Sequence, residues 1–178
     1  MRANILLLQV ISFLLVFCQS EQSERQDALE QIRTDETFIQ NQMAEGAGTE
    51  EMSDRSRQLA ERYAGFQERF PDHDKSPDFL FQGAMLYAEM LGEFNKSIEL
   101  LLRLQQDYQE HEIAERALFL AGFMYDYELD EPEKADELYT RFLQMYPESE
   151  LAEGVHQARE YSGSDPDQVI PEMMPPRQ

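Results

Sequence analysis

Several acidic side chains stand close together between residues 126 and 137, and their spacing approaches that of a calcium-binding loop. Asp126, Glu128 and Asp130 alternate along the chain, and Glu137 occupies the twelfth position counted from Asp126. A calcium loop of this kind needs a glycine at its sixth position for a sharp turn. Here the sixth position is Glu131, and the segment also carries the pattern of two helices with a turn between them. We therefore predict a helical hairpin at this place and no calcium site.

The three histidines, His73, His111 and His156, are the other candidates for metal or proton chemistry. They form no HExxH motif and no paired spacing typical of metal ligands, and we interpret them as unrelated positions at the surface or in turns. The sequence also has no GxSxG motif, Walker loop or GxGxxG motif, and no pattern that sets a nucleophile beside a base. We therefore predict a protein that is not an enzyme and that uses no cofactor and no metal.

The charge of the chain argues against two classes of partner. The formal net charge is −21, from 36 acidic and 15 basic residues, and no basic patch interrupts the acidic sequence. A field of this sign repels nucleic acid and anionic lipid headgroups, so we expect neither as a partner. The simplest interpretation of the charge is solubility.

The N-terminal residues indicate export. Arg2 precedes a mostly apolar run from Ile5 to Phe17, after which the sequence becomes polar. This run is shorter than the roughly 20 residues that a membrane span needs, but it suits the apolar core of a secretory signal peptide. We therefore expect the protein to work outside the cytoplasm.

Cys18 is the single cysteine and follows the apolar run directly, so an internal disulfide framework is excluded. Residues 15–18, Leu-Val-Phe-Cys, resemble the lipobox of bacterial lipoproteins, although Phe17 stands where that pattern has a small residue. The resemblance implies a signal peptide at 1–18, a lipid on Cys18, and an outer-membrane lipoprotein that faces the periplasm. Cleavage after Ser20, which would give a soluble secreted or periplasmic protein, and an uncleaved anchor are the alternatives.

Three segments of the chain align with one another at a constant interval, and the sequence therefore has a period of 38. They are RQLAERYAGFQERFP from Arg57, NKSIELLLRLQQDYQ from Asn95 and EKADELYTRFLQMYP from Glu133. Two further segments share the interval, FLFQGAMLYAEML from Phe79 and ALFLAGFMYDYEL from Ala117, and apolar residues recur in them at helical spacing. A fixed period of this length is typical of a solenoid of helix hairpins. We predict that the small residues at 83–84 and 121–122 let neighbouring helices approach closely.

This array resembles tetratricopeptide repeats, whose pattern has a small residue and a tyrosine on the first helix, a small residue and an aromatic on the second, and a final proline. The earlier of the two copies departs from this pattern at three positions. Ser97 stands where the pattern has a small alanine, Leu101 where it has an aromatic residue, and Gln109 where it has the proline. The period is similar to that of envelope lipoproteins in bacteria with two membranes, among them repeat proteins of the outer-membrane barrel-assembly and Tol-Pal systems. The better-matching copy carries Leu118, Ala121, Gly122, Tyr125, Ala135, Tyr139 and Pro147.

The resemblance implies an all-α fold, a short right-handed α-solenoid of about two and a half hairpins and about six helices. The repeat domain is expected at 51–162, with an opening helix at about 52–70 and a closing helix at about 150–161. Residues 19–50 are expected to be a flexible acidic tether, with a short helix at 27–43, and residues 163–178 a Pro-rich tail. The short helix is suggested by the helical spacing of Leu29, Ile32, Ile39 and Met43.

The first helix of each hairpin is expected to line the concave face of the solenoid. Its aromatic residues are interpreted either as core between hairpins or as anchors of a groove for a helix or extended segment of a partner. We expect a non-catalytic scaffold or adaptor in the bacterial cell envelope that binds a protein through this face, in outer-membrane assembly or maintenance. A self-associating structural envelope lipoprotein is the alternative, and a groove for small ligands or glycans is a third hypothesis. The candidate groove residues are Phe81, Met85, Glu89, Arg116, Phe119, Phe123, Asp126 and Tyr127.

Overall fold

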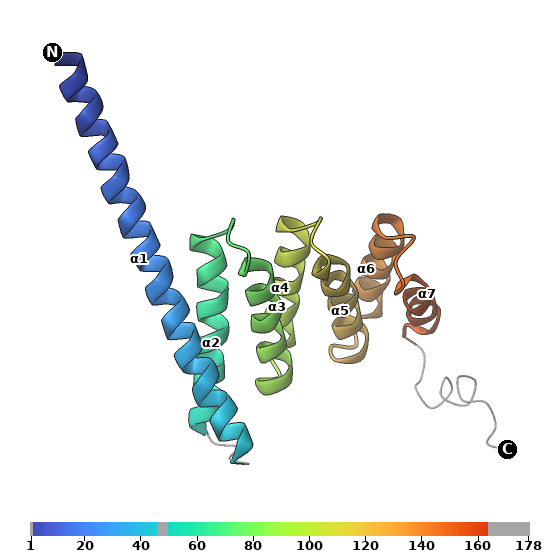
Figure 1. Ribbon diagram of the computed structural model, residues 1–178. Helices are drawn as coiled ribbons and strands as arrows, with labels where there is room; N and C mark the ends of the chain where they lie inside the picture. Colours follow the sequence, from blue (N-terminus) through green and yellow to red (C-terminus); the bar gives the residue numbers. More distant parts are fainter. Residues whose placement is uncertain (1, 46–49, 164–178) are drawn as a thin grey trace.

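The chain folds as a row of helix hairpins. The computed structural model describes residues 2–45 and 50–163, with residues 2–18 described by their backbone alone, and within these ranges it contains helices and no strands. Each helix packs against its neighbour in sequence, and the hairpins stand side by side (Figure 1). The predicted all-α, repeat-like helical solenoid is therefore confirmed. The helices are α1 (Arg2–Ala44), α2 (Glu50–Arg69), α3 (Ser76–Met85), the π-helix η1 (Leu86–Met90), α4 (Phe94–Asp107), α5 (Ile113–Tyr127), α6 (Pro132–Met145) and α7 (Ala152–Tyr161).

The aligned columns of the sequence repeat form the core of the array. Tyr63, Leu101 and Tyr139 occupy one column and are exposed by 3% or less. Full burial of an apolar side chain of this size stabilises a fold by about 1.5–3 kcal/mol, so the stacked columns hold successive hairpins together. A second column is fully buried and consists of Phe66, Leu104 and Phe142.

Small residues bring the two helices of each hairpin together, as predicted. A Cβ atom added to Gly122 of α5 would lie 2.9 Å from Cε1 of Tyr139 in α6. A Cβ atom added to Gly83 of α3 would lie 3.2 Å from Cδ1 of Leu100 in α4. Both positions therefore allow an approach that a larger residue would hinder.

The hairpin of α3, η1 and α4 and the hairpin of α5 and α6 each contain an equivalent polar contact at the turn between their helices. In one hairpin Lys96 pairs with Glu93 at 2.8 Å and lies over the ring of Tyr87; in the other Lys134 pairs with Glu131 in the same way. The pKa of Glu93 is lowered because its carboxylate accepts hydrogen bonds from Lys96 and from an arginine of α2. The fold thus repeats in its contacts as well as in its sequence.

The segment 126–137 has the structure that the sequence predicts. Helix α5 ends at Tyr127, helix α6 begins at Pro132, and the turn between them includes Asp130 with a positive φ of 52°. In the other copy Gly92, with a φ of 64°, ends the first helix as predicted, but the residues before it form η1 instead of a regular α-helix. A π-helix of this kind widens the last turn, and the sequence pattern did not reveal it.

The segment that follows Cys18 differs from the flexible tether that the sequence suggested for 19–50. Residues 19–44 belong to α1, and the C-terminal half of this helix lies along α2 (Figure 1). Ala28, Ile32 and Ile39 are buried there, in one cluster with apolar side chains of α2. The short helix predicted at 27–43 is thus the docked part of a much longer one, and the burial of these side chains explains its order.

An ion-pair cluster around one buried carboxylate joins α1 to α2. Asp35 is only 2% exposed, and its carboxylate oxygens lie 2.8 Å from a guanidinium nitrogen of Arg55 and 2.8 Å from Nε of Arg62. The next residue, Glu36, accepts a hydrogen bond of 2.7 Å from the hydroxyl of Tyr63. A buried carboxylate that is paired in this way favours one register of the two helices, because a slipped register would leave Asp35 unpaired.

Helix α7 closes the array with a polar outer face, as expected for the terminal helix of a solenoid. Val155 is fully buried against α6, whereas Glu153, Gln157 and Arg159 are not. The helix ends at Tyr161, and the predicted Pro-rich tail lies outside the described residues beyond Gly163.

Candidate partner-binding face

The candidate groove residues come from α3, η1 and α5. Phe81 and Met85 lie on α3, Glu89 lies in η1, and the other five lie on α5. The guanidinium of Arg116 lies 5.1 Å from the centre of the Phe81 ring, so this contact joins the first helices of the two hairpins.

Three aromatic side chains run along α5 at intervals of four residues, and we call them the aromatic stripe: Phe119, Phe123 and Tyr127. The ring centres of Phe119 and Phe123 lie 6.2 Å apart, and those of Phe123 and Tyr127 lie 4.5 Å apart in a stacked arrangement. Residues four apart share one face of a helix, so the three rings form one continuous strip.

The stripe becomes more exposed toward the C-terminal end of α5. Phe119 is half-buried and packs against the core cluster that contains Tyr139. Phe123 is also half-buried, and Tyr127 is 53% exposed. The two interpretations of these aromatic residues therefore apply to different members, because one end of the stripe contributes to the core and the other end faces solvent.

The copies differ at the stripe. The positions one repeat period earlier hold Phe81, Met85 and Glu89. Phe81 and Met85 are half-buried against the central core cluster, and Glu89 is exposed. The earlier copy has η1 at the last of these positions and still forms a helix hairpin, so a hairpin of this array does not require aromatic residues at the last two positions.

Asp126 is one of the candidate groove residues, and in the structure its carboxylate makes contacts within the fold. Its Oδ1 atom accepts hydrogen bonds from the hydroxyl of Ser162 at 2.8 Å and from the backbone N–H of Gly163 at 3.3 Å. Burial raises the pKa of the Tyr139 hydroxyl, and the nearby charge of Asp126 raises this pKa further. Asp126 therefore ties the end of α5 to the residues that follow α7.

The model of the tetratricopeptide repeat matches residues 116–149, which include most of α5 and all of α6. This part of the chain is similar to a tetratricopeptide repeat. A comparison with curated proteins gives no match. Tetratricopeptide repeats suggest a scaffold for protein–protein interaction and are generally not catalytic, so the match supports a binding protein.

The histidines correct one interpretation of the sequence. His73 and His111 are one repeat period apart and occupy the same place in the turn before the first helix of a repeat. In each of them Nδ1 accepts a hydrogen bond from the backbone N–H two residues further on, at 3.1 and 3.3 Å, and the hydroxyl of Ser149 accepts the equivalent bond at 3.1 Å. These side chains satisfy N–H groups at the start of a helix, whereas His156 is exposed on α7.

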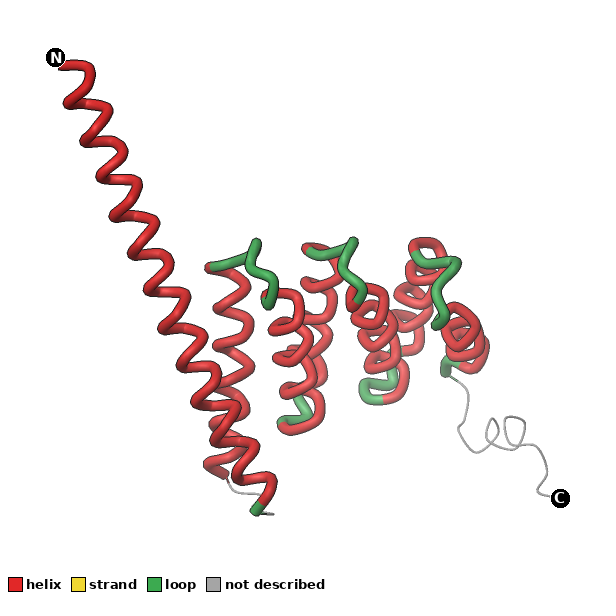
Figure 2. Tube along the Cα trace, viewed as in Figure 1, coloured by secondary structure: helices red, strands yellow, loops and turns green. Residues whose placement is uncertain are grey.

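The three turns lie along one edge of the array (Figure 2). The sequence contains the signal for this equivalence, because the turns read PDHDK, QEHEI and PESEL at the same place in successive repeats. The spacing of metal ligands does not indicate this equivalence, whereas the repeat period of 38 residues does.

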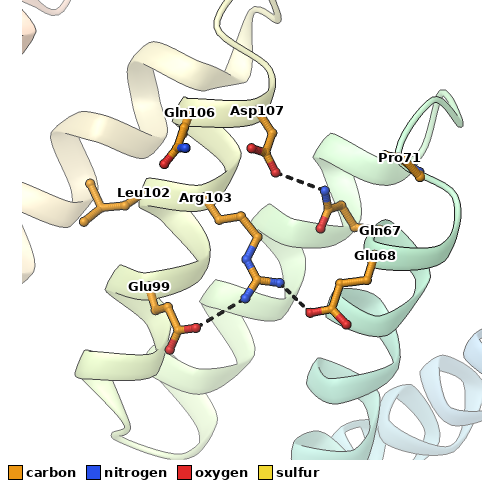
Figure 3. Close-up of a pocket in the computed structure, with 8 residues that line it drawn as sticks. All are labelled: Gln67, Glu68, Pro71, Glu99, Leu102, Arg103, Gln106 and Asp107. Atoms are coloured by element: carbon orange, nitrogen blue, oxygen red, sulfur yellow. Dashed lines mark hydrogen bonds and ion pairs between the residues drawn. The ribbon is translucent and has the colours of Figure 1, made fainter.

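A hollow of about 580 Å³ lies between α2 and α4 (Figure 3). Arg103 crosses it and pairs with Glu68 at 2.9 Å and with Glu99 at 3.3 Å, while the amide of Gln67 donates to Asp107 at 3.1 Å. Because these polar groups pair with one another across the seam, we interpret the hollow as part of the contact between repeats and not as a ligand site.

Within residues 19–45 and 50–163, whose side chains the structure describes, no three His, Cys, Asp or Glu side chains are placed to hold a metal ion. Over the same part of the chain, no helix has the length and apolarity needed to cross a membrane.

Proposed function

We propose that the protein is a non-catalytic adaptor that binds a segment of another protein on the face formed by α3 and α5. The observation that carries this proposal is the aromatic stripe, whose Tyr127 is 53% exposed at a position where the neighbouring copy has Glu89. Exposed aromatic side chains that the fold does not require are typical anchors of protein interfaces.

The shape and charge of the face suggest the kind of segment. The stripe spans two turns of α5, with half-buried Met85 and Phe81 on the neighbouring helix. Arg116 and Glu89 are exposed and place one charge of each sign on this face. A short helix or extended strand with two or three apolar side chains and a mixed polar edge would match it.

We further propose that the adaptor works in the bacterial cell envelope, in outer-membrane assembly or maintenance. The support is the apolar run before Cys18, the lipobox-like residues 15–18, and the resemblance of the repeat period to that of envelope lipoproteins. Lipid on Cys18 would attach the protein to the periplasmic side of the outer membrane. A soluble periplasmic or secreted form is the alternative.

The lipid is tested by growing cells with an alkyne-tagged fatty acid. We expect the tag on the wild-type protein and not on the Cys18→Ser variant, which should also leave the membrane fraction. An equal amount of tag on both proteins would refute lipidation at Cys18 and favour the soluble form.

The binding face is tested by crosslinking in living cells with a photoreactive residue at Tyr127. The matched control places the same residue at Met145, which is 37% exposed on α6. We expect a protein captured from Tyr127 and not from Met145, and we expect Phe123→Ser to abolish the capture while the circular dichroism spectrum stays unchanged. Capture of this chain alone would favour the self-associating lipoprotein, and equal capture at both positions would refute the face.

A further inference from the structure

We propose that the chain's own C-terminal residues, 164–178, bind along the aromatic stripe and compete there with a partner. The inference rests on the proposed function in one respect, since it gives the same face a second, intramolecular ligand. Its test needs no partner protein, so either proposal can fail while the other stands.

The first support is the place where the described chain ends. The hydroxyl of Ser162 and the backbone N–H of Gly163 both donate to Asp126, which directly precedes Tyr127 in α5. The chain therefore leaves Gly163 beside the last turn of α5, at the exposed end of the stripe.

The second support is the fixed geometry of this end. Gly163 has a φ of 72°, a conformation that favours glycine, and a Cβ atom added to it would lie 3.2 Å from Cβ of Pro132. Together with the hydrogen bonds to Asp126, this packing holds the start of the C-terminal segment beside α5 and α6. A segment that starts at a fixed point next to its binding surface has a high effective concentration there, so even weak contacts suffice.

The third support is length. The segment from 164 to 178 can span up to roughly 50 Å when extended. The helix from Phe119 to Tyr127 rises only about 12 Å along α5. The C-terminal segment is therefore long enough to cover the whole stripe and to reach Arg116 one turn beyond it.

The fourth support is the chemistry of the segment. Proline-rich sequences favour the extended polyproline II conformation, which lies against aromatic surfaces at a low cost in conformational entropy. Methionine side chains adapt to irregular surfaces and make favourable contacts with aromatic rings. Glu172 supplies a carboxylate of the right sign to pair with the exposed Arg116. The segment contains Pro166, Pro171, Pro175 and Pro176, and the apolar residues Val169, Ile170, Met173 and Met174.

The test uses a fluorescent reporter in the full chain, solubilised in a mild detergent. The protein has no tryptophan, so Tyr127→Trp creates a single reporter at the exposed end of the stripe. Its exposure is measured by acrylamide quenching. The test variant changes the four apolar residues of the segment to serine, and the matched control changes four polar residues of the same segment, Asp165, Asp167, Gln168 and Gln178, to serine.

We expect the quenching constant to rise about twofold or more in the test variant, because the ring loses the side chains that exclude water, and to stay unchanged in the control. A second reporter, Met145→Trp on α6, should show equal quenching in all backgrounds. The same constant in the Tyr127→Trp protein with and without the four serine substitutions of the test variant would overturn the inference. Protection that disappears on dilution would also overturn it, because the occupant would then be a second copy of the chain.

Discussion

Replacing Gly122 by alanine tests the close packing of α5 on α6, the hairpin that carries the aromatic stripe. The new Cβ atom would lie 2.9 Å from Cε1 and 3.0 Å from Cδ1 of Tyr139. Tyr139 is fully buried, so its ring cannot move into solvent and the helices must separate instead. Overpacking of this kind costs about 1–3 kcal/mol. Alanine also gains about 1 kcal/mol over glycine within a helix, so the net change is a loss of up to about 2 kcal/mol.

Two glycines elsewhere supply matched controls. Gly65 in α2 and Gly154 in α7 are also helical, but a Cβ atom added to either meets nothing within 4 Å. We therefore expect Gly65→Ala and Gly154→Ala to stabilise the protein by about 0.5–1 kcal/mol. The assay is urea unfolding followed by circular dichroism, with the three variants compared by midpoint and slope. If Gly122→Ala gains as much stability as Gly65→Ala, the reasoning about the tight approach to Tyr139 is refuted.

Three further predictions concern other parts of the fold. Asp35→Ala should weaken the docking of α1 on α2 by about 1–3 kcal/mol, because two arginines lose their buried partner. Amide hydrogen exchange should become faster in residues 28–44 but not in α5. Asp27 is exposed, so the control Asp27→Ala should change neither the docking energy nor the exchange rates. His111→Ala should cost about 0.5–1.5 kcal/mol, because the backbone N–H of Ile113 loses its acceptor. His111→Ser should cost much less, because a serine makes the same bond in the next repeat, and equal losses would contradict the role of this bond in the turn. Burial raises the pKa values of Tyr63 and Tyr139 in the folded protein. The contribution of their neutral side chains to the free energy of unfolding is therefore full below about pH 10 and is lost as the pH rises through the higher folded-state pKa values. Ultraviolet titration should therefore show these two hydroxyls ionising only with unfolding, and ionisation of all eight tyrosines in one step near pH 10 with helices intact would refute it.

The helical array could be predicted because the same packing pattern recurs in each copy of the sequence repeat. A tyrosine or leucine at the column of residue 101, a small residue at the column of residue 122 and a charged pair at the turn each recur once per repeat period. A local pattern that recurs in register excludes most alternative folds, since each copy must bury the same face against the next.

The contacts outside the repeat period could not be predicted in the same way. The apolar spacing of Ile32 and Ile39 indicated a helix, but it did not show which surface the helix would cover. Asp35 looked like one more solvated acid in an acidic segment, and its burial depends on two arginines of the next helix, Arg55 and Arg62. Asp126 likewise found its donors beyond the end of the last helix. Such pairings need the tertiary arrangement, because no local propensity encodes them.

The docking of α1 changes what a lipid on Cys18 would do. A flexible tether of about 30 residues would let the array move freely over the membrane surface. In the structure only residues 19–27 separate Cys18 from Ala28, the first buried residue after Cys18, and this short stretch is helical. A helix of that length rises only about 14 Å. The paired Asp35 then fixes the helix on α2, and α2 packs on α3. A lipidated protein would therefore present its repeats at a set distance from the membrane and in a restricted orientation. Such an arrangement favours one membrane-proximal partner over capture from the surrounding space, because it raises the effective concentration only for segments within that reach.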